Sequence, residues 1–180
     1  MSRIVIVSGP PGAGKSTVAQ RLSQQVAGPL GMHMHTDDIY TYVTKGFIEP
    51  WKPESMAQNI TLMAAMAAQA AVCAGRGYEV YVDGLIGPWF LDPWREAAGA
   101  HAVDLRYLVL RPDLATTLAR ATARTAPNAM TDPAVVEQMW RAFQGDAVVP
   151  DHVVDTTRHT MLETIRGVAE DLEAGRFRLT

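Results

Sequence analysis

The glycine-rich sequence GPPGAGKST, Gly9 to Thr17, directly follows the apolar run Arg3–Ser8. A helical pattern begins after it, from about Lys15 to Ala27. Glycines allow successive backbone N–H groups to turn inward, and a helix N-terminus presents free amides and the positive end of its dipole. The stretch therefore predicts a phosphate-binding loop between a buried strand and a helix.

The spacing Gly-x4-Gly-Lys-Ser matches the P-loop pattern in its required context, so we predict a bound nucleoside triphosphate, with ATP and Mg²⁺ as the cofactors. Lys15 adds a charge near the β and γ phosphates and is a catalytic candidate, while the Ser16 hydroxyl is a candidate Mg²⁺ ligand. The candidate nucleotide-binding residues of the loop are Gly9, Pro10, Pro11, Gly12, Ala13, Gly14, Lys15, Ser16 and Thr17. Guanine specificity is unsupported, because the late segment 152–157 lacks the Asn-Lys-x-Asp motif of GTPases. The preference for ATP over other triphosphates stays open.

The amino-acid composition favours a globular domain and argues against binding to nucleic acid or membranes. The 180 residues, 48% hydrophobic and 19% charged, predict one globular domain. A net charge of -3 gives no overall basic field for nucleic acid or an anionic membrane. The single cysteine, Cys73, forms no internal disulfide framework, and we find neither a signal-peptide pattern nor an apolar stretch of membrane-spanning length. We therefore expect a cytoplasmic monomer or homodimer.

Short apolar segments alternate with helical patterns along the chain. The expected strands are Ile4–Val7, Met32–His35, Glu79–Val82, Leu105–Leu110 and His152–Val154. The expected helices are about Lys15–Ala27, Asp37–Thr44, Pro53–Ala74, Pro93–Ala98, Pro112–Ala123, Asp132–Phe143 and Thr160–Ala174. This alternation predicts an α/β fold with a mostly parallel sheet and helices on both faces. The connectors 45–53 and 84–94 are expected to wall a pocket.

Carboxylates follow the second and third expected strands. Because ligands bind beyond the carboxyl ends of parallel strands, Asp37, Asp38 and Asp83 converge on the phosphate loop. We predict that Asp37 accepts the proton of an acceptor hydroxyl, and that Asp83 contacts Mg²⁺ through water. The alternative makes an aspartate the N-cap of the next helix, and we favour capping for Asp38. His35 is a weak candidate for substrate contact, and we favour core packing for it.

Two arginines follow the fourth expected strand. Arg120 and Arg124 are four residues apart, so on a helix they point the same way and can clamp the β and γ phosphates; the alternative is a solvated basic face. Both are catalytic candidates, and Arg120 is also a nucleotide-binding candidate. Arg111 is a third, less certain candidate. The loop Thr125–Met130 is expected to close over ATP and exclude water, within a lid region of about 112–145.

At these residues the chain resembles the P-loop small-molecule kinases, a class that includes nucleoside monophosphate, shikimate and gluconate kinases, and among them the chloramphenicol phosphotransferases. The similarity covers nearly the whole chain. The resemblance implies a three-layer P-loop NTPase fold with a five-stranded parallel sheet of order 2-3-1-4-5, in one domain over residues 1–180. It implies that Asp37 is the catalytic aspartate. It also implies that Asp155, Thr156 and Thr157 form a turn beside the adenine, with a substrate-side region of about 38–75.

Departures from related kinases concern the acceptor. Polynucleotide kinases usually have an arginine where Tyr40 stands, and Asp83-Gly84 is followed by the apolar stretch 85–90 instead of the Phe-Pro-Arg of nucleoside monophosphate kinases. A phosphate-bearing acceptor calls for arginine, so we expect an uncharged, partly hydrophobic small molecule with a hydroxyl group. The candidate pocket walls are Trp51, Trp89, Phe90 and Trp94, for which core packing is equally open. The methionines 56, 63 and 66 are expected to be mainly core.

The leading hypothesis is an ATP-dependent kinase that phosphorylates a small-molecule alcohol, such as an antibiotic or another metabolite. Two alternatives stay open. One is a nucleoside or polynucleotide 5′-hydroxyl kinase, although the acidic balance and Tyr40 argue against nucleic acid. The other is a nucleotide-binding regulatory module with little catalysis, in which Asp37 is only a helix cap.

Overall fold

Five parallel strands form the centre of the protein in a computed structural model that describes residues 2–126, 129–144 and 150–179. The sheet order is β2-β3-β1-β4-β5, as predicted. The strands are β1 Arg3–Ser8, β2 Gly31–His35, β3 Glu79–Asp83, β4 Asp104–Leu110 and β5 Val153–Val154. Every pairing between neighbouring strands is parallel, so all five carboxyl ends lie at one edge.

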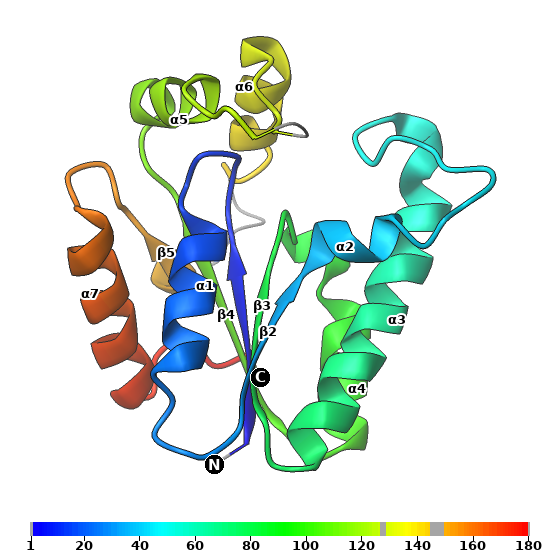
Figure 1. Cartoon of the computed structure of the whole chain (residues 1–180), viewed down its shortest axis with the longest axis vertical. Coiled ribbons are helices and arrows are strands. Elements are labelled where there is room, and N and C mark those ends of the chain that lie inside the picture. Colours follow the sequence, from blue (N-terminus) through cyan, green and yellow to red (C-terminus); the bar gives the residue numbers. More distant parts are fainter. Residues whose placement is uncertain (1, 127–128, 145–149, 180) are drawn as a thin grey trace.

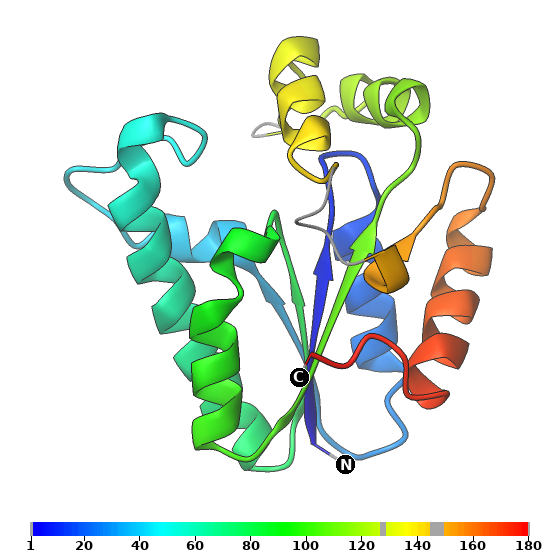
Figure 2. The same cartoon turned by 180° about the vertical axis from the view of Figure 1, so that it is seen from behind.

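Helices cover both faces of this sheet (Figures 1 and 2). One face is covered by α1 Lys15–Gln24 and α7 Met161–Glu173, and the other by α3 Met56–Gly75 and α4 Asp92–Ala100. Three further helices, α2 Thr36–Tyr40, α5 Leu114–Thr122 and α6 Pro133–Arg141, lie toward the carboxyl ends of the strands. Single 3-10 turns occupy Pro53–Ser55, Pro88–Phe90 and Pro150–His152.

The central strand explains why the sheet is buried on both sides. In β1, Ile4 and Ile6 pack with the core under α3 and α4, whereas Val5 and Val7 pack with the core under α1 and α7. All four side chains are fully buried. A continuous run of β-branched residues therefore forms a strand with two apolar faces, which is typical of a parallel sheet inside a three-layer fold.

The predicted strands and helices are confirmed to within a few residues, and the exceptions have local causes. Helix α2 ends at Tyr40 instead of Thr44, where the Thr41 hydroxyl donates to the Asp38 carbonyl at 2.6 Å and ends the regular helix. Helix α5 begins after Asp113, whose side chain accepts from the Thr116 N–H at 2.7 Å and caps the helix.

The C-terminal segment adds a feature that the sequence did not predict. The Tyr107 N–H donates to the Phe177 carbonyl at 2.9 Å, the Leu179 N–H donates to the Leu105 carbonyl at 3.0 Å, and Arg106 pairs with Arg178 in an antiparallel bridge. The short strand β5 pairs with Val109 and Leu110 at the C-terminal end of β4. The C-terminal segment pairs with the N-terminal half of β4, on the same side. The backbone groups of β4 that β5 does not reach are thereby paired instead of being left open.

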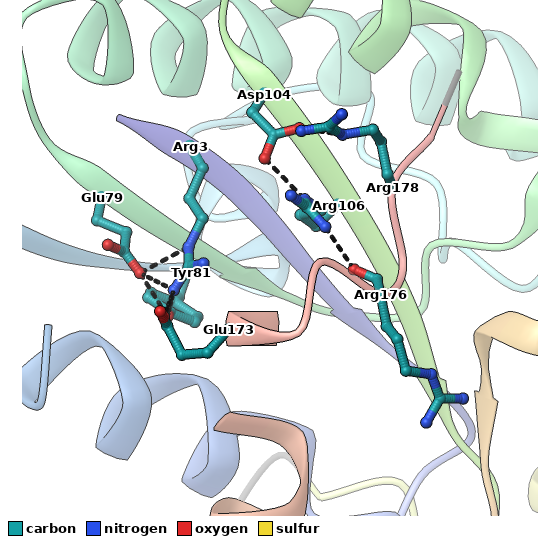
Figure 3. Close-up of polar contacts among 8 residues, drawn as sticks. All are labelled: Arg3, Glu79, Tyr81, Asp104, Arg106, Glu173, Arg176 and Arg178. Carbon is teal, nitrogen blue, oxygen red and sulfur yellow. Dashed lines mark hydrogen bonds and ion pairs between the residues drawn. The ribbon is translucent and has the colours of Figure 1, made fainter. Parts of the chain in front are cut away.

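Polar contacts fix this segment against β4 (Figure 3). The Arg106 side chain, in a residue only 6% exposed, donates to Asp104 Oδ2 at 2.7 Å and to the Arg176 carbonyl at 2.7 Å. Arg3 bonds Glu79 at 2.8 Å and Glu173 at 3.1 Å, which joins β1 and β3 to the end of α7.

Candidate active site

The glycine-rich loop connects β1 to α1, and its backbone turns at three glycines. Gly9, Gly12 and Gly14 all have positive φ angles, at 139°, 79° and 89°. Gly14 is the N-cap of α1, and no side chain among the described residues caps that helix. The amides of its first turn are therefore available to an anion, so the loop fits the phosphates of a nucleotide.

Close packing shows how the loop is held. A Cβ atom at Gly12 would lie 2.8 Å from the Ala121 nitrogen and 3.0 Å from the Thr117 carbonyl oxygen, so the loop backbone rests directly on α5. Glycine at this position allows both the left-handed backbone and the close approach. The phosphate loop and the predicted lid helix are thus in contact.

Lys15 lies at the centre of the site. Its Nζ donates to the Pro10 carbonyl at 2.9 Å. Burial lowers the pKa of Lys15 to about 8, the carboxylates of Asp83 and Asp37 oppose that shift, and the charge of Arg124 adds to it. The Lys15 amine is therefore held by the loop that directly precedes it.

Ser16 and Asp83 form the candidate magnesium site. The Ser16 hydroxyl donates to Asp83 Oδ2 at 2.5 Å, and the Asp83 side chain is fully buried. A hydroxyl and a carboxylate are oxygen donors of the kind Mg²⁺ prefers, and they lie beside the amides that would hold the phosphates. These residues fit a phosphate-bound Mg²⁺, and the role predicted for each stays a prediction.

Two histidines of β2 complete the surroundings of Asp83, and the sequence predicted these contacts for neither of them. His33 Nε2 lies 2.6 Å from Asp83 Oδ1, and His35 Nδ1 lies 3.0 Å from Asp83 Oδ2. His35 Nε2 also lies 3.3 Å from Asp37 Oδ2. Core packing for His35 is therefore wrong, because its ring lies between two carboxylates, hydrogen-bonded to Asp83 and in an ion-pair contact with Asp37. The missed signal is the alternation Met32-His33-Met34-His35, which places both histidines on one face of the strand.

The charges of this cluster stabilise one another. Burial acts to raise the pKa of Asp83, but hydrogen bonds with His33, His35 and Ser16 outweigh it and hold the pKa well below its usual range. Hydrogen bonds to Asp37 and Asp83 raise the pKa of His35 to about 10. The contact with His35 in turn lowers the pKa of Asp37. Asp37 is thus ionised at neutral pH and can accept a hydrogen bond from a hydroxyl group.

Asp37 and Asp38 lie in the first turn of α2. The N-cap of that helix is His35, and no side chain of the described residues caps it. The capping role favoured for Asp38, and considered for Asp37, is therefore wrong, because the helix begins one residue earlier than predicted and both aspartates lie inside it. The Asp37 side chain is 78% exposed. Its role as the catalytic base stays a prediction.

The two predicted clamp arginines do not share a helix face. Arg120 lies on α5 and donates to the Thr156 carbonyl at 3.4 Å, whereas α5 ends at Thr122 and leaves Arg124 beyond the helix. Arg111 is held elsewhere, donating to the Phe143 carbonyl at 2.7 Å. The predicted mobile loop Thr125–Met130 includes residues 127–128, which lie outside the described residues. A clamp by Arg120 and Arg124 stays a prediction.

The turn after β5 has a defined structure. Asp155 Oδ1 accepts from the Thr157 N–H at 2.9 Å and from the Thr157 hydroxyl at 2.5 Å, and Thr157 Oγ1 accepts from the Asp113 N–H at 2.8 Å. An open pocket of about 550 Å³ lies there, lined by Asp113, Asp155, Thr157, Arg158 and His159. Arg120 contacts the Thr156 carbonyl in the same turn. Adenine binding at this turn stays a prediction, with space for a base beside it.

The candidate pocket walls divide into core and surface residues. Trp94 is fully buried and Phe90 nearly so, and both belong to the hydrophobic core. Trp89 and Trp51 are exposed, and the Trp89 ring packs against Phe143 of the α6 end at a centroid distance of 6.0 Å. Only the two exposed tryptophans therefore stay candidates for contact with an acceptor.

Polar contacts hold α2 and the start of α3 together; the segment 36–59 is called the arm below. The Tyr40 hydroxyl donates to Asn59 Oδ1 at 3.0 Å, and Asn59 donates to the Pro50 carbonyl at 2.8 Å. Burial raises the pKa of Tyr40 to about 12, and the nearby Asp37 charge adds to that shift. Where a polynucleotide kinase has arginine, this chain has a neutral phenol that supports the arm.

Helix α3 is the most apolar helix described. The expectation that no apolar stretch has membrane-spanning length is wrong, because the segment Pro53–Gly75 is long and apolar enough to cross a membrane by length and composition alone. Met63 and Met66 of this helix are buried in the core, as predicted for the methionines, whereas Met56 is exposed. The inward face of α3 therefore serves as part of the core.

A parallel sheet of order 2-3-1-4-5, with a glycine-rich phosphate loop between its first strand and helix, defines a P-loop protein with the fold of small-molecule kinases. Within that class the chain belongs to the AAA domain family, whose match covers residues 4–145. A comparison with curated proteins finds no match.

Solved structures agree with this assignment. A sugar kinase from Janibacter is similar over 96% of this chain and 95% of its own, with a TM-score of 0.76 and 16% identity. The tunicamycin resistance protein of Deinococcus radiodurans is similar over 100% and 99%, with a TM-score of 0.69 and 14% identity. The APS kinase of Mycobacterium tuberculosis in complex with AMPPNP and APS is similar over 96% and 98%, with a TM-score of 0.68 and 18% identity. At these identities the similarity shows the shared kinase fold.

Proposed function

We propose that this protein is an ATP-dependent phosphotransferase that moves the γ-phosphoryl group of ATP to a hydroxyl group of a small molecule. The observation that carries the proposal is the place of Asp37. Its carboxylate is exposed and ionised, and it is joined through His35 and Asp83 to Ser16 of the phosphate loop. A base beside the phosphate loop, open to an incoming ligand, is what transfer to an alcohol requires.

In the proposed reaction, Asp37 accepts the proton of the acceptor hydroxyl. The hydroxyl oxygen forms a bond to the γ-phosphorus, and the bond from that phosphorus to the bridging oxygen breaks, so that ADP leaves with the electron pair. Lys15, Arg120 and Arg124 offset the charge that spreads over the phosphoryl oxygens. Ser16 and Asp83 would hold Mg²⁺, which would supply positive charge to offset that of the phosphates.

The class of acceptor is inferred from the loop that follows β3. Loop 84–94 contains no lysine, arginine or histidine, and it presents the exposed ring of Trp89. Such a surface suits an uncharged and partly hydrophobic alcohol better than a phosphorylated one. An uncharged antibiotic that carries a hydroxyl group would be an acceptor of this class. One of the structural relatives is named as a tunicamycin resistance protein.

The proposal is tested by measuring ADP release from Mg·ATP with a panel of hydroxyl compounds. The panel contains uncharged aromatic and aliphatic alcohols, sugars, nucleosides and 5′-hydroxyl oligonucleotides. We expect ADP release with at least one apolar alcohol and none above background with the oligonucleotides. ATP binding without ADP release for any member would contradict the proposal, and transfer only to nucleosides or oligonucleotides would support the alternative acceptor.

Replacement of Asp37 separates a kinase from a binding module. Asp37→Asn should lower kcat by about 10³-fold while ATP binding stays intact, because only the proton acceptor is lost. The matched control is Asp38→Asn, which removes the neighbouring exposed carboxylate and should leave turnover within about 3-fold of the original, as expected for a residue outside the reaction. Equal turnover in both variants would assign Asp37 no part in catalysis.

A further inference from the structure

Strand β2 presents two chemically different faces. Met32 and Met34 point into the core beside α3, whereas His33 and His35 lie on the opposite face with Asp83 of the neighbouring strand. In the register of the sheet, His35 is the direct partner of Asp83. The pairing of β2 with β3 therefore fixes where the His35 ring lies.

The His35 ring connects a fixed carboxylate to a free one. On one side, Asp83 is fully buried and is also bonded by Ser16 at 2.5 Å and by His33 at 2.6 Å. On the other side, the Asp37 side chain is 78% exposed, and among the described residues His35 is the one side chain with which it has a polar contact. Asp83 is thus held by three groups and Asp37 by one.

We propose that His35 is a positioning residue that holds the Asp37 carboxylate in place by anchoring it, through its own ring, to buried Asp83. This inference rests on the proposed function, in which Asp37 is the base. An exposed aspartate otherwise samples several rotamers, and only some of them point its carboxylate toward an acceptor hydroxyl. His35 also links the candidate metal site to the base, because Asp83 serves both.

The effect expected for such a residue falls on turnover and not on nucleotide affinity. Supporting residues of this kind typically contribute about 10- to 100-fold to activity. Neither contact of His35 is to the phosphate loop, so loss of its ring should leave the binding of Mg·ATP within about 3-fold of the original value. A drop in kcat with an unchanged KM for Mg·ATP is therefore the expected signature.

Two conservative variants separate the two nitrogens of the ring. The side-chain amide of His35→Gln reaches the position of Nε2 and keeps a donor for Asp37, whereas that of His35→Asn reaches only the position of Nδ1 and keeps a donor for Asp83. Because the anchor needs both contacts, we expect kcat to fall about 10- to 100-fold in His35→Asn, in His35→Gln and in His35→Ala. The matched comparison is His33→Ala, which removes a contact to Asp83 and none to Asp37, and which should leave the Asp37 carboxylate in its place.

Crystal structures of the same full-length variants give a readout that does not depend on turnover. In His35→Ala and His35→Asn the Asp37 carboxylate should leave its position near residue 35 or become disordered, while Asp83 keeps its bond to Ser16. The inference is overturned if Asp37 keeps its place in His35→Ala, or if His35→Gln, which keeps the contact with Asp37 and loses the one with Asp83, retains the original kcat. If no compound of the panel is phosphorylated, the proposed function fails, and the position of Asp37 still decides whether His35 fixes it.

Discussion

Ser16 and Asp83 meet where the first helix and the third strand come together, with the hydroxyl oxygen 2.5 Å from a carboxylate oxygen that is shielded from solvent. Sixty-seven positions separate them in the sequence. Their contact depends on the parallel pairing of β1 with β3, which brings Asp83 opposite Val7. The fold thus places a buried negative charge directly beneath the start of α1, where the amide dipoles favour a negative charge.

Replacement of this carboxylate should weaken magnesium binding more than nucleotide binding. In Asp83→Asn the charge that attracts Mg²⁺ is gone, so the Mg²⁺ concentration needed for half-maximal ATP binding should rise by about 10- to 100-fold. The measurement is a titration of a fluorescent ATP analogue at a series of free Mg²⁺ concentrations. Ser16→Ala should shift the titration in the same direction. An unchanged Mg²⁺ requirement in both variants would remove these residues from the metal site.

The histidine between the two carboxylates should make stability depend on pH. The contacts with Asp37 and Asp83 raise the pKa of His35 to about 10, so its charged form is favoured in the folded protein. The resulting stabilisation is fully present below the unfolded pKa of about 6.5 and is lost as the pH rises through about 10. In EDTA, the free energy of unfolding of the unaltered protein minus that of His35→Gln should therefore decrease from pH 6.5 to pH 10. A difference that is constant over this range would contradict the assignment of a charged ring.

The sequence predicted the parts of the site that depend on local signals. Glycine spacing identified the loop, and the ends of apolar strands identified Asp37 and Asp83, because parallel strands align their carboxyl ends at one edge. The contacts of His33 and His35 depend on the register between β2 and β3, and a single sequence does not fix the register of strands that are distant in the chain. The expectation of core packing for His35 was wrong for that reason.

Other differences also arise from tertiary contacts. The separation of Arg124 from Arg120 follows from the end of α5 at Thr122, and helix boundaries are the least predictable feature of a sequence. The C-terminal segment pairs with β4 through a few isolated residues. These residues show no alternation of apolar and polar side chains that would predict a strand, so the sequence did not indicate the pairing. Trp94 was a candidate for the pocket wall because side-chain type alone does not distinguish a buried tryptophan from one at a surface.

The buried arginine of β4 should contribute strongly to stability. Arg106→Met keeps the apolar volume but removes the donors to Asp104 and to the Arg176 carbonyl, so we expect a loss of about 2 kcal/mol in the free energy of unfolding. The control is Arg178→Met, which removes an exposed bond to the same aspartate and should cost less than about 1 kcal/mol. Urea unfolding measures both. Equal losses would mean that burial of Arg106 adds nothing.

The first glycine of the phosphate loop should not tolerate a side chain. At Gly9 the φ angle is 139°, and a Cβ atom would lie 2.2 Å from the Leu110 carbonyl oxygen. Gly9→Ala should therefore lower the free energy of unfolding by about 3 kcal/mol and displace the loop from β4. In Gly28→Ala, where no atom lies within 4 Å of the new methyl group, stability should change by less than about 1 kcal/mol. A Gly9→Ala protein as stable as Gly28→Ala would show that the loop adapts.

The loop lysine should make nucleotide binding sensitive to alkaline pH. In the free protein burial lowers the pKa of Lys15 to about 8, whereas bound phosphates would favour its charged form and raise that pKa again. Above pH 8 the free protein has lost this charge, so ATP binding must take up a proton. The dissociation constant should then rise by up to about tenfold per pH unit.

Calorimetry in buffers of different ionisation enthalpy measures this proton directly. At pH 9 binding of ATP should take up about one proton per site, and at pH 7 almost none, because the difference in protonation between the free and bound lysine vanishes below its lower pKa. Lys15→Met supplies the control: it should bind ATP more weakly at every pH and lack the uptake at pH 9. If the unaltered protein and Lys15→Met took up equal numbers of protons at pH 9, the lysine would not be the group that titrates, and its charge would have to be fixed by Asp37 and Asp83 before the nucleotide arrives.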